Sequence, residues 1–282
     1  MKEKLVTIGN DVKMAAVLAE PASTANKPNA FLFVNAGLIH RVGPHRLYVR
    51  IARQLAGAGY FALRFDLSGR GDNDVRRDGA AFLESSLAET RTAMDFLEQT
   101  TGARRFVLFG ICSGAINALQ AAVADDRVAG VIAVDGPAYP TTGYLIRRYA
   151  KRLMGGEAWR NTLQGRNKLG RLLRGRGGAT EREPNQFADL YGNAETPPRS
   201  EAEAALRRIV DRGVRLKFIY TGSWSIYNYQ NQFRDAFPDL VKTGQISVAY
   251  VPDSDHTFTS LRNQKRLMDL VDAWVRDKIE RA

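Results

Sequence analysis

The sequence predicts an α/β fold in which helices cover both faces of a mostly parallel β-sheet. Short, continuous apolar runs, typical of strands buried on both faces, recur along the chain. Segments with apolar residues at helical spacing separate these runs, and such alternation favours parallel strands joined by helical crossovers. At residues 106–115 an apolar run passes abruptly into a helical pattern of small residues. With 282 residues, 44% of them hydrophobic, the chain suits one large domain, or one domain with an insertion.

The N-terminal half is expected to begin with a hairpin. Apolar patterns predict strands at 4–8, 12–18, 31–34 and 61–65, and helices at 44–58 and 83–100. The turn Gly9-Asn10-Asp11 joins the first two strands, which we expect at the edge of the sheet. The first helix has Pro44 near its start and Gly59 after its end, where each residue is best tolerated.

The C-terminal half continues the alternation but is interrupted by a basic segment. Here the patterns predict strands at 106–109, 128–134, 216–220 and 246–251, and helices at 115–123, 200–211 and 261–279. Between residues 139 and 198 glycines are frequent and apolar runs are short. This segment holds eleven Lys or Arg against five Asp or Glu, a net charge of +6 out of +11 for the whole chain.

The turn between strand 106–109 and the following helix carries a candidate nucleophile. Gly110, Cys112 and Gly114 alternate there, and a strained turn tolerates only small residues two positions before and after its tip. Ser113 is the alternative, but its neighbour Ile111 is too bulky for that place. A buried cysteine acting as a small apolar residue is the structural alternative. The pattern G-x-C-x-G resembles the nucleophile elbow of the α/β-hydrolase superfamily, normally G-x-S-x-G.

This resemblance extends over the chain except residues 139–198, where α/β hydrolases carry a lid. It implies an α/β-hydrolase core of residues 1–138 and 199–282, and a basic lid insertion at 139–198 after the strand that ends at Asp135. The turn from Asp66 to Asn73 resembles the D-x-x-G-x-G-x-S turn of the superfamily, so we interpret Asp66 as structural and not as a catalytic acid.

The resemblance also locates an oxyanion hole, which stabilises negative charge on a reacting carbonyl oxygen. The loop 35–43 lies where the superfamily places the loop that supplies one backbone amide. The expected donors are the amide of Ser113 and the amide of Leu38 or Gly37. His40, in the same loop, is expected to touch the substrate.

His256 is the candidate base, because it follows the last strand in a D-H-T-F context that resembles the superfamily's histidine loop. The superfamily usually places the orienting acid in a G-x-x-D loop after the preceding strand, but here Ser225 holds that position. Asp135, at the end of an earlier strand, is the expected acid. Asn228 and a Cys–His dyad without an acid remain alternatives. Trp224, with Tyr227 nearby, is expected to line the pocket, although packing under the lid explains both aromatic residues equally well.

These residues predict a cysteine-dependent acyl-transfer enzyme, a thioester or ester hydrolase or an acyltransferase, that forms an acyl-Cys112 intermediate with His256 as base. The sequence resembles dienelactone hydrolases, acyl shuttles of natural-product assembly lines and hydrolases associated with bacterial exopolysaccharide export. A non-catalytic binding module on the same scaffold is the alternative, favoured by Ser225 in the acid's usual place.

The composition of the chain limits the kinds of binding partner that we expect. No nucleic-acid-binding signature accompanies the basic charge, so we expect instead a substrate bound to coenzyme A or to an acidic carrier protein. We expect no metal and no cofactor. No apolar run approaches the ~20 residues of a membrane span, the first residues lack the apolar core of a signal peptide, and the single cysteine excludes an internal disulfide. These features favour a cytoplasmic location and leave the oligomeric state open.

Overall fold

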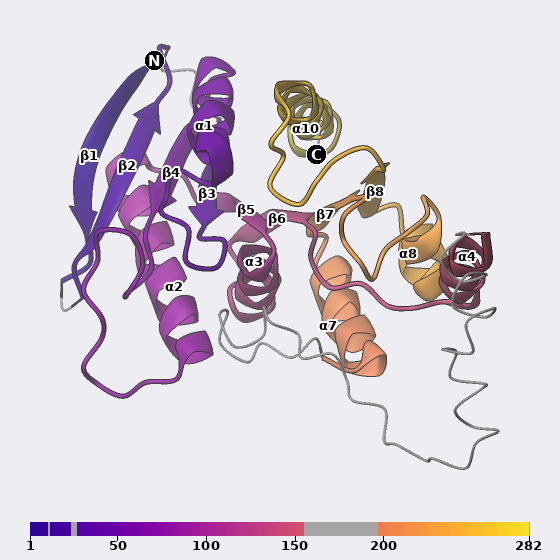
Figure 1. Ribbon diagram of the computed structural model, residues 1–282. Coiled ribbons are helices and arrows are strands. Elements are labelled where there is room, and N and C mark those ends of the chain that lie inside the picture. The colour runs from indigo at the N-terminus through magenta and orange to yellow at the C-terminus, as the bar shows by residue number, and fades with distance from the viewer. Residues whose placement is uncertain (11, 24–26, 155–196, 282) are drawn as a thin grey trace.

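The computed structural model describes residues 1–10, 12–23, 27–154 and 197–281, which form an eight-stranded sheet with helices on both sides (Figure 1). The strands are β1 (Lys2–Ile8), β2 (Met14–Glu20), β3 (Asn29–Val34), β4 (Phe61–Phe65), β5 (Arg105–Ile111), β6 (Val128–Val134), β7 (Arg215–Thr221) and β8 (Ile246–Val251). Their order across the sheet is β1-β2-β4-β3-β5-β6-β7-β8.

Most neighbouring strands in this sheet run parallel. Only β2 pairs antiparallel with its neighbours, β1 on one side and β4 on the other. The expected hairpin is therefore present, but of its two strands only β1 lies at an edge of the sheet. From β4 to β8 every pair is parallel. Because the carboxyl ends of parallel strands meet at one edge, the loops after β3, β5, β6, β7 and β8 gather there.

The helices divide between the two faces and enclose one apolar core on each. The longer ones are α1 (Leu47–Gly57), α2 (Phe82–Thr101), α3 (Ser113–Ala124), α7 (Arg199–Asp211) and α10 (Leu261–Trp274). Buried residues of α1 and α10 pack on one face, and those of α2, α3 and α7 pack on the other (Figure 1). Both faces of the central strands are covered, which explains their continuous apolar runs. The predicted fold is confirmed.

Two predicted helices are interrupted. Helix 44–58 is a short 3-10 turn, η1 (Pro44–Arg46), followed by α1, because His45 and Arg46 have positive φ values of 49° and 60°. Helix 261–279 ends as α10 and continues as a π-turn, η2 (Val275–Ile279). Two short helices, α8 (Gln232–Ala236) and α9 (Pro238–Lys242), have no counterpart in the sequence prediction.

Part of the expected lid lies inside the described residues. Residues 155–196 of the expected lid, 139–198, lie outside them, and α4 (Thr142–Met154) lies within. Near its start α4 contacts the loop after β7: the Tyr144 hydroxyl donates to the Ser225 carbonyl at 2.9 Å, and the Arg147 guanidinium lies 4.2 Å from the ring centre of Tyr229. The described part of this segment thus adjoins the edge where the strand ends gather.

Candidate active site

Cys112 lies at the tip of a strained turn between β5 and α3. Its backbone has φ 56° and ψ −120°, a conformation that side chains rarely adopt. A Cβ atom on Gly110 would lie 2.2 Å from the carbonyl of Gly114, and one on Gly114 would lie 2.6 Å from the Asn35 carbonyl oxygen. Both glycines are therefore required by close backbone approach, as the alternating pattern predicts. The thiol of Cys112 is half-buried.

His256 and Asp135 meet above the ends of β6 and β8. The Nδ1 atom of His256 lies 2.8 Å from Oδ2 of Asp135, which is fully buried. The same carboxylate accepts a hydrogen bond from the Thr221 amide at 2.7 Å and another from the Thr221 hydroxyl at 2.6 Å. Asn228 instead donates to the Tyr144 carbonyl, so the structure brings Asp135, and not Asn228, to the histidine.

Asp135 and Cys112 both change the pKa of His256. Burial alone would lower the pKa of His256, but hydrogen bonds and negative charge from Asp135 and Cys112 outweigh burial and raise the pKa from 6.5 to about 10. The contacts with Asp135 and Cys112 therefore favour the imidazolium form of the ring. Thiol, imidazole and carboxylate follow one another in a continuous series of contacts, the arrangement that activates a nucleophile.

The loop after β3 contributes backbone amides beside the thiol. The amide of Gly37 donates to Oγ of Ser113 at 2.8 Å, so it already has an acceptor. Leu38 lies at the tip of a turn closed by a hydrogen bond from the Ile39 amide to the Ala36 carbonyl, and its side chain is 58% exposed. The amides of Leu38 and Ser113 have no acceptor among the described residues. Of the two expected loop donors, the geometry thus favours Leu38 over Gly37.

Residues 31–276 match the model of the Alpha/beta hydrolase family. The chain belongs to this family. Among solved structures of similar fold, the esterase PF2001 of Pyrococcus furiosus has 14% identity and a TM-score of 0.63, and the match covers 99% of this chain and 91% of that chain. Est1E of Butyrivibrio proteoclasticus has 14% identity and a TM-score of 0.61, with 98% of this chain and 99% of that chain covered. A lidless serine hydrolase of Xanthomonas campestris has 16% identity and a TM-score of 0.56, with 98% of this chain and 94% of that chain covered. At these identities they show the fold alone. No curated protein matches the chain.

In this alpha/beta hydrolase, Asp66 anchors the loop after β3. The buried Asp66 carboxylate accepts hydrogen bonds from the Asn35 side chain at 3.0 Å, from the Arg41 amide and from the Arg41 guanidinium. A Cβ atom on Gly71 would lie 2.2 Å from Oδ2 of Asp66, so a glycine there lets the turn close over the carboxylate. Asp66 makes no hydrogen bond or ion pair with His256, and its partners are those of a structural residue.

His40 belongs to a cluster of charged groups at the base of this loop. Its Nε2 atom lies 3.2 Å from Oδ2 of Asp72 and 2.7 Å from Nη1 of Arg41. His40, Asp66 and Asp72 are residue types that bind metals, and their ligand atoms lie within 4.8 Å of one another. The Arg41 guanidinium, however, donates to both carboxylates and already supplies the positive charge that a cation would bring. The structure therefore places His40 in an ion-pair cluster, where its expected contact with substrate stays untested.

Of the two aromatic residues expected to line the pocket of this alpha/beta hydrolase, Trp224 lies at the candidate site and Tyr227 lies in the core. Trp224 stacks on His256, with ring centres 5.0 Å apart and planes 9° from parallel. Tyr227 is 1% exposed, its ring stacks on Tyr220 at 3.8 Å, and its hydroxyl donates to the Gln230 carbonyl. Tyr227 offers no surface to a substrate, so we assign it to the core instead of to the pocket.

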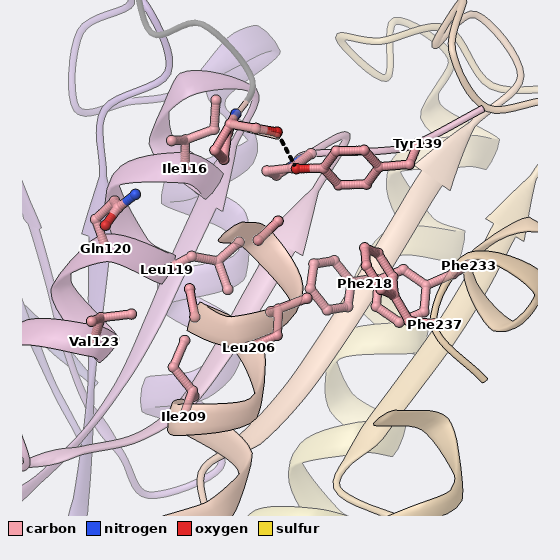
Figure 2. Close-up of a pocket in the computed structure, with 14 residues that line it drawn as sticks. Ile116, Leu119, Gln120, Val123, Tyr139, Leu206, Ile209, Phe218, Phe233 and Phe237 are labelled. Atoms are coloured by element: carbon pink, nitrogen blue, oxygen red, sulfur yellow. Dashed lines mark hydrogen bonds between the residues drawn. The ribbon is translucent and has the colours of Figure 1, made fainter. Parts of the chain in front are cut away.

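A cavity of about 50 Å³ lies beside α3, between this helix, α7 and β7 (Figure 2). Its lining is almost entirely apolar and includes Ile116, Leu119, Leu206, Ile209, Phe218 and Phe237. Neither Cys112 nor His256 lines it. The candidate site of this alpha/beta hydrolase is therefore identified by its chemical groups and not by this cavity.

Two contributors to the site were not predicted from the sequence. Thr221 fixes the Asp135 carboxylate through two hydrogen bonds, and the hydroxyl of Ser113 holds the Gly37 amide. A signal for Thr221 was available, because it directly precedes the loop in which the family usually carries the acid. Nothing in the sequence indicates the Ser113 contact, which joins residues 76 positions apart. Among the described residues, no helix is long and apolar enough to cross a membrane.

Proposed function

We propose that this alpha/beta hydrolase is a cysteine-dependent acyl-transfer enzyme that acts on a thioester or ester through an acyl-Cys112 intermediate. The observation that carries this proposal is the series of contacts from Cys112 to His256 and from His256 to Asp135, with the thiol at the tip of a strained elbow. Each group has a distinct role in acyl transfer: nucleophile, base and orienting acid.

The first half of the reaction acylates the enzyme. The thiolate of Cys112 forms a bond to the carbonyl carbon, and the π electron pair moves to the carbonyl oxygen. The amides of Ser113 and Leu38 donate hydrogen bonds to this oxyanion. When the intermediate collapses, the bond to the leaving group breaks, and the leaving group takes a proton from the imidazolium of His256.

The second half transfers the acyl group onward. Water or an acceptor attacks the acyl carbon and gives its proton to the now neutral His256, and collapse releases the Cys112 thiolate. Hydrolysis and transfer differ only in which nucleophile reaches the acyl enzyme. Throughout, Asp135 accepts a hydrogen bond from Nδ1–H of His256 and keeps the other ring nitrogen directed at the reacting atoms, while Thr221 prevents the carboxylate from turning.

Thioesters suit this site better than amides. Exchange of one thioester for another is nearly balanced in free energy, so a thiolate nucleophile accepts the acyl group from a thioester at little cost in free energy, whereas an amide is more stable than a thioester. The substrates that carry thioesters, coenzyme A and the phosphopantetheine arm of carrier proteins, are negatively charged. The net charge of +6 in residues 139–198 favours such partners by long-range attraction.

The alternative of a non-catalytic binding module loses its support. It rested on Ser225 in the place where the family usually carries the acid. Asp135 now provides a carboxylate to His256 from the neighbouring strand, with an ordinary hydrogen-bond length of 2.8 Å. We therefore carry forward the enzyme alone.

Intact-protein mass spectrometry with a panel of acyl thioesters tests the proposal. The wild-type chain should gain the mass of one acyl group, and peptide mapping should locate it on Cys112, the single cysteine. Cys112→Ala should abolish the adduct while leaving the far-UV circular dichroism unchanged. An adduct that persists in Cys112→Ala would transfer the nucleophile role to another residue, such as Ser113. No adduct with any thioester or activated ester would contradict an acyl-enzyme mechanism.

A further inference from the structure

Trp224 occupies the loop from which the family usually supplies the orienting acid. Here that loop supplies no carboxylate, and it still touches the histidine through the indole of Trp224. The two rings are nearly parallel, 9° apart, with centres separated by 5.0 Å. This is the offset stacking geometry that aromatic rings prefer. The loop after β7 thus contacts His256 across the ring face, while Asp135 contacts it through a ring nitrogen.

The backbone presses the two loops together at this point. The Gly222 amide donates to the Val251 carbonyl at 3.0 Å, and a Cβ atom on Gly222 would lie 1.9 Å from the Pro252 carbonyl oxygen. The loop after β7 can therefore approach the loop after β8 only because residue 222 is glycine. Within the first loop, the Trp224 amide donates to the Thr221 carbonyl at 3.2 Å. The position of the indole is set by this backbone.

The indole is held by packing and not by a hydrogen bond of its own. Its Nε1 atom is buried and has no acceptor among the described residues. A buried indole N–H usually finds a partner. The contact that the indole does make near the site is through its face, which lies against the imidazole of His256.

We propose that Trp224 is a positioning residue for His256, fixing the plane of the imidazole and stabilising its charged form. A single hydrogen bond from Nδ1 to Asp135 fixes one atom of the ring but leaves the ring free to tilt about that atom. A parallel aromatic face removes this tilt, so the second ring nitrogen stays directed at Cys112. An aromatic face also attracts a cation placed over it, which favours the imidazolium. This inference rests on the proposed function of the Cys112–His256 pair.

Other charged groups near His256 do not provide this restraint. Asp135 and Cys112 hold the two ring nitrogens. The Asp255 carboxylate, next in the chain, is turned away to accept hydrogen bonds from Thr257 and Thr259. On β8, the phenol of Tyr250 interacts with the charge of Asp135. Among the described residues, only Trp224 stacks on the imidazole ring.

The test is the rate of Cys112 alkylation by iodoacetamide as a function of pH, together with kcat and KM for an uncharged acyl thioester. Trp224→Met keeps apolar volume but removes the ring face, and Trp224→Phe keeps a face. We expect Trp224→Met to raise the pH midpoint for thiolate formation by ~0.5–1 unit and to lower kcat by ~3–10-fold at nearly constant KM. In Trp224→Phe, which keeps an aromatic face, the pH midpoint and kcat should both lie close to the wild-type values. Ser225→Ala, an exposed neighbour in the same loop, is the control and should match the wild type.

Two further variants separate the possible failures. If His256→Ala leaves the alkylation profile of the wild type unchanged, the Cys112–His256 pair does not exist and the proposed function fails. If His256→Ala shifts the profile but Trp224→Met does not, the proposed function survives and the role of Trp224 is contradicted. Equal losses in Trp224→Phe and Trp224→Met would also contradict it, because packing volume alone would then explain the effect. Trp224→Leu replaces Trp224→Met if thermal melting shows that the latter does not fold.

Discussion

Cys112 and Asp135 share an unusual backbone feature. Both are non-glycine residues with positive φ, 56° and 47°, and both directly follow neighbouring strands, β5 and β6. Such conformations are costly and persist where the surroundings enforce them. Here the Cys112 amide donates to the Val134 carbonyl, and the Asp135 amide donates to the Ile219 carbonyl, so each residue is tied to the next strand. The strain aims a thiol and a carboxylate at the same histidine.

Ser113 provides a prediction at this scale. Its hydroxyl accepts a hydrogen bond from the Gly37 amide and so ties the loop 35–43 to the turn that carries Cys112. Ser113→Ala should leave the loop less restrained and reduce kcat about tenfold, less than the ~100-fold or greater loss from deleting an oxyanion donor. KM should change little, because the change acts on the transition state. The cost in stability should be ~1 kcal/mol, the usual value of one hydrogen bond.

Steady-state kinetics and chemical unfolding of Ser113→Ala provide the measurement, with Ser225→Ala as an exposed control. A tenfold rise in KM at unchanged kcat would show that the hydroxyl binds substrate instead of restraining the loop.

The sequence located the principal groups of the site because their signals are local. Gly110 and Gly114 frame Cys112, and His256 and Asp135 each follow a recognisable strand. The stacking of Trp224 on His256 could not be predicted from the sequence, since that contact depends on how closely two loops approach. For Tyr227 the sequence left pocket lining and packing open for a related reason: whether an aromatic residue in a loop points into the pocket or into the core depends on packing that no spacing encodes.

Among the elements, α4 stands out for its exposure. Tyr144 is its buried anchor, whereas residues 145–150 are exposed. Exposed apolar residues such as Ile146, whose exposed fraction is 62%, lie beside the basic residues that follow in the sequence. Arg147 and Arg148 contact the tyrosine rings of Tyr229 and Tyr144, yet they remain exposed themselves. A charged helix in this position meets any substrate that approaches the strand ends from that side.

Replacing Arg147, Arg148, Lys151 and Arg152 together by glutamine tests its role. We expect use of coenzyme A- or carrier-bound thioesters to weaken, with a smaller difference at high salt, because screening reduces the attraction for the anionic group in the wild type as well. We expect the melting temperature to change by no more than a few degrees, because Arg147 and Arg148 are exposed and charges at exposed positions contribute little to stability. Turnover of a small uncharged thioester is the control and should be retained. Equal losses with charged and uncharged substrates would show that α4 builds the site and does not recognise charge.

Element boundaries followed the sequence where apolar patterning decides them, as in β4, β6 and β8, whose predicted and observed bounds coincide. The observed boundaries differ from the predicted ones where tertiary contacts determine the backbone conformation. The left-handed conformations of His45 and Arg46 are accompanied by a hydrogen bond from the Tyr48 amide to the Val42 carbonyl, which a propensity for helix does not anticipate. The five-residue helices α8 and α9 are too short to show a period.

At the scale of the whole molecule, His256 links the site to stability. It binds its proton more tightly in the folded chain, where its pKa is about 10, than in the unfolded chain, where it is 6.5. Its favourable contribution is therefore complete below about pH 6.5 and is lost as the pH rises through about 10. The difference in the free energy of unfolding between wild type and His256→Gln should accordingly shrink across this range. Urea unfolding at several pH values measures it.

Asp135→Asn should weaken this pH dependence, because it removes one of the two groups that raise the histidine pKa. A difference between wild type and His256→Gln that stays constant from pH 6 to pH 10 would mean that the histidine is neutral in the folded protein. The ion pair invoked for the thiol would then have no basis.

The overall fold was accessible from the sequence because strand and helix alternate and the elbow marks the central strand β5. Family membership agrees with this, although similar solved structures share only 14–16% of residues. Such low identity is expected when a fold is specified by the pattern of apolar positions and by a few glycines in turns. The acyl group and its acceptor depend on side chains around the thiol, where no such pattern exists.

The position of Asp135 on β6 has a consequence for how this scaffold can change. Because the carboxylate comes from the strand between β5 and β7, the tip of the loop after β7 is relieved of supplying an acid. Its constraints are reduced to Thr221, Gly222, the face of Trp224 and Ser223, whose hydroxyl lies 3.3 Å from that of Thr221, while Ser225 is exposed. Ser225 is accordingly the place where an evolving or engineered descendant can acquire a new side chain at the rim of the site without disturbing the reacting groups.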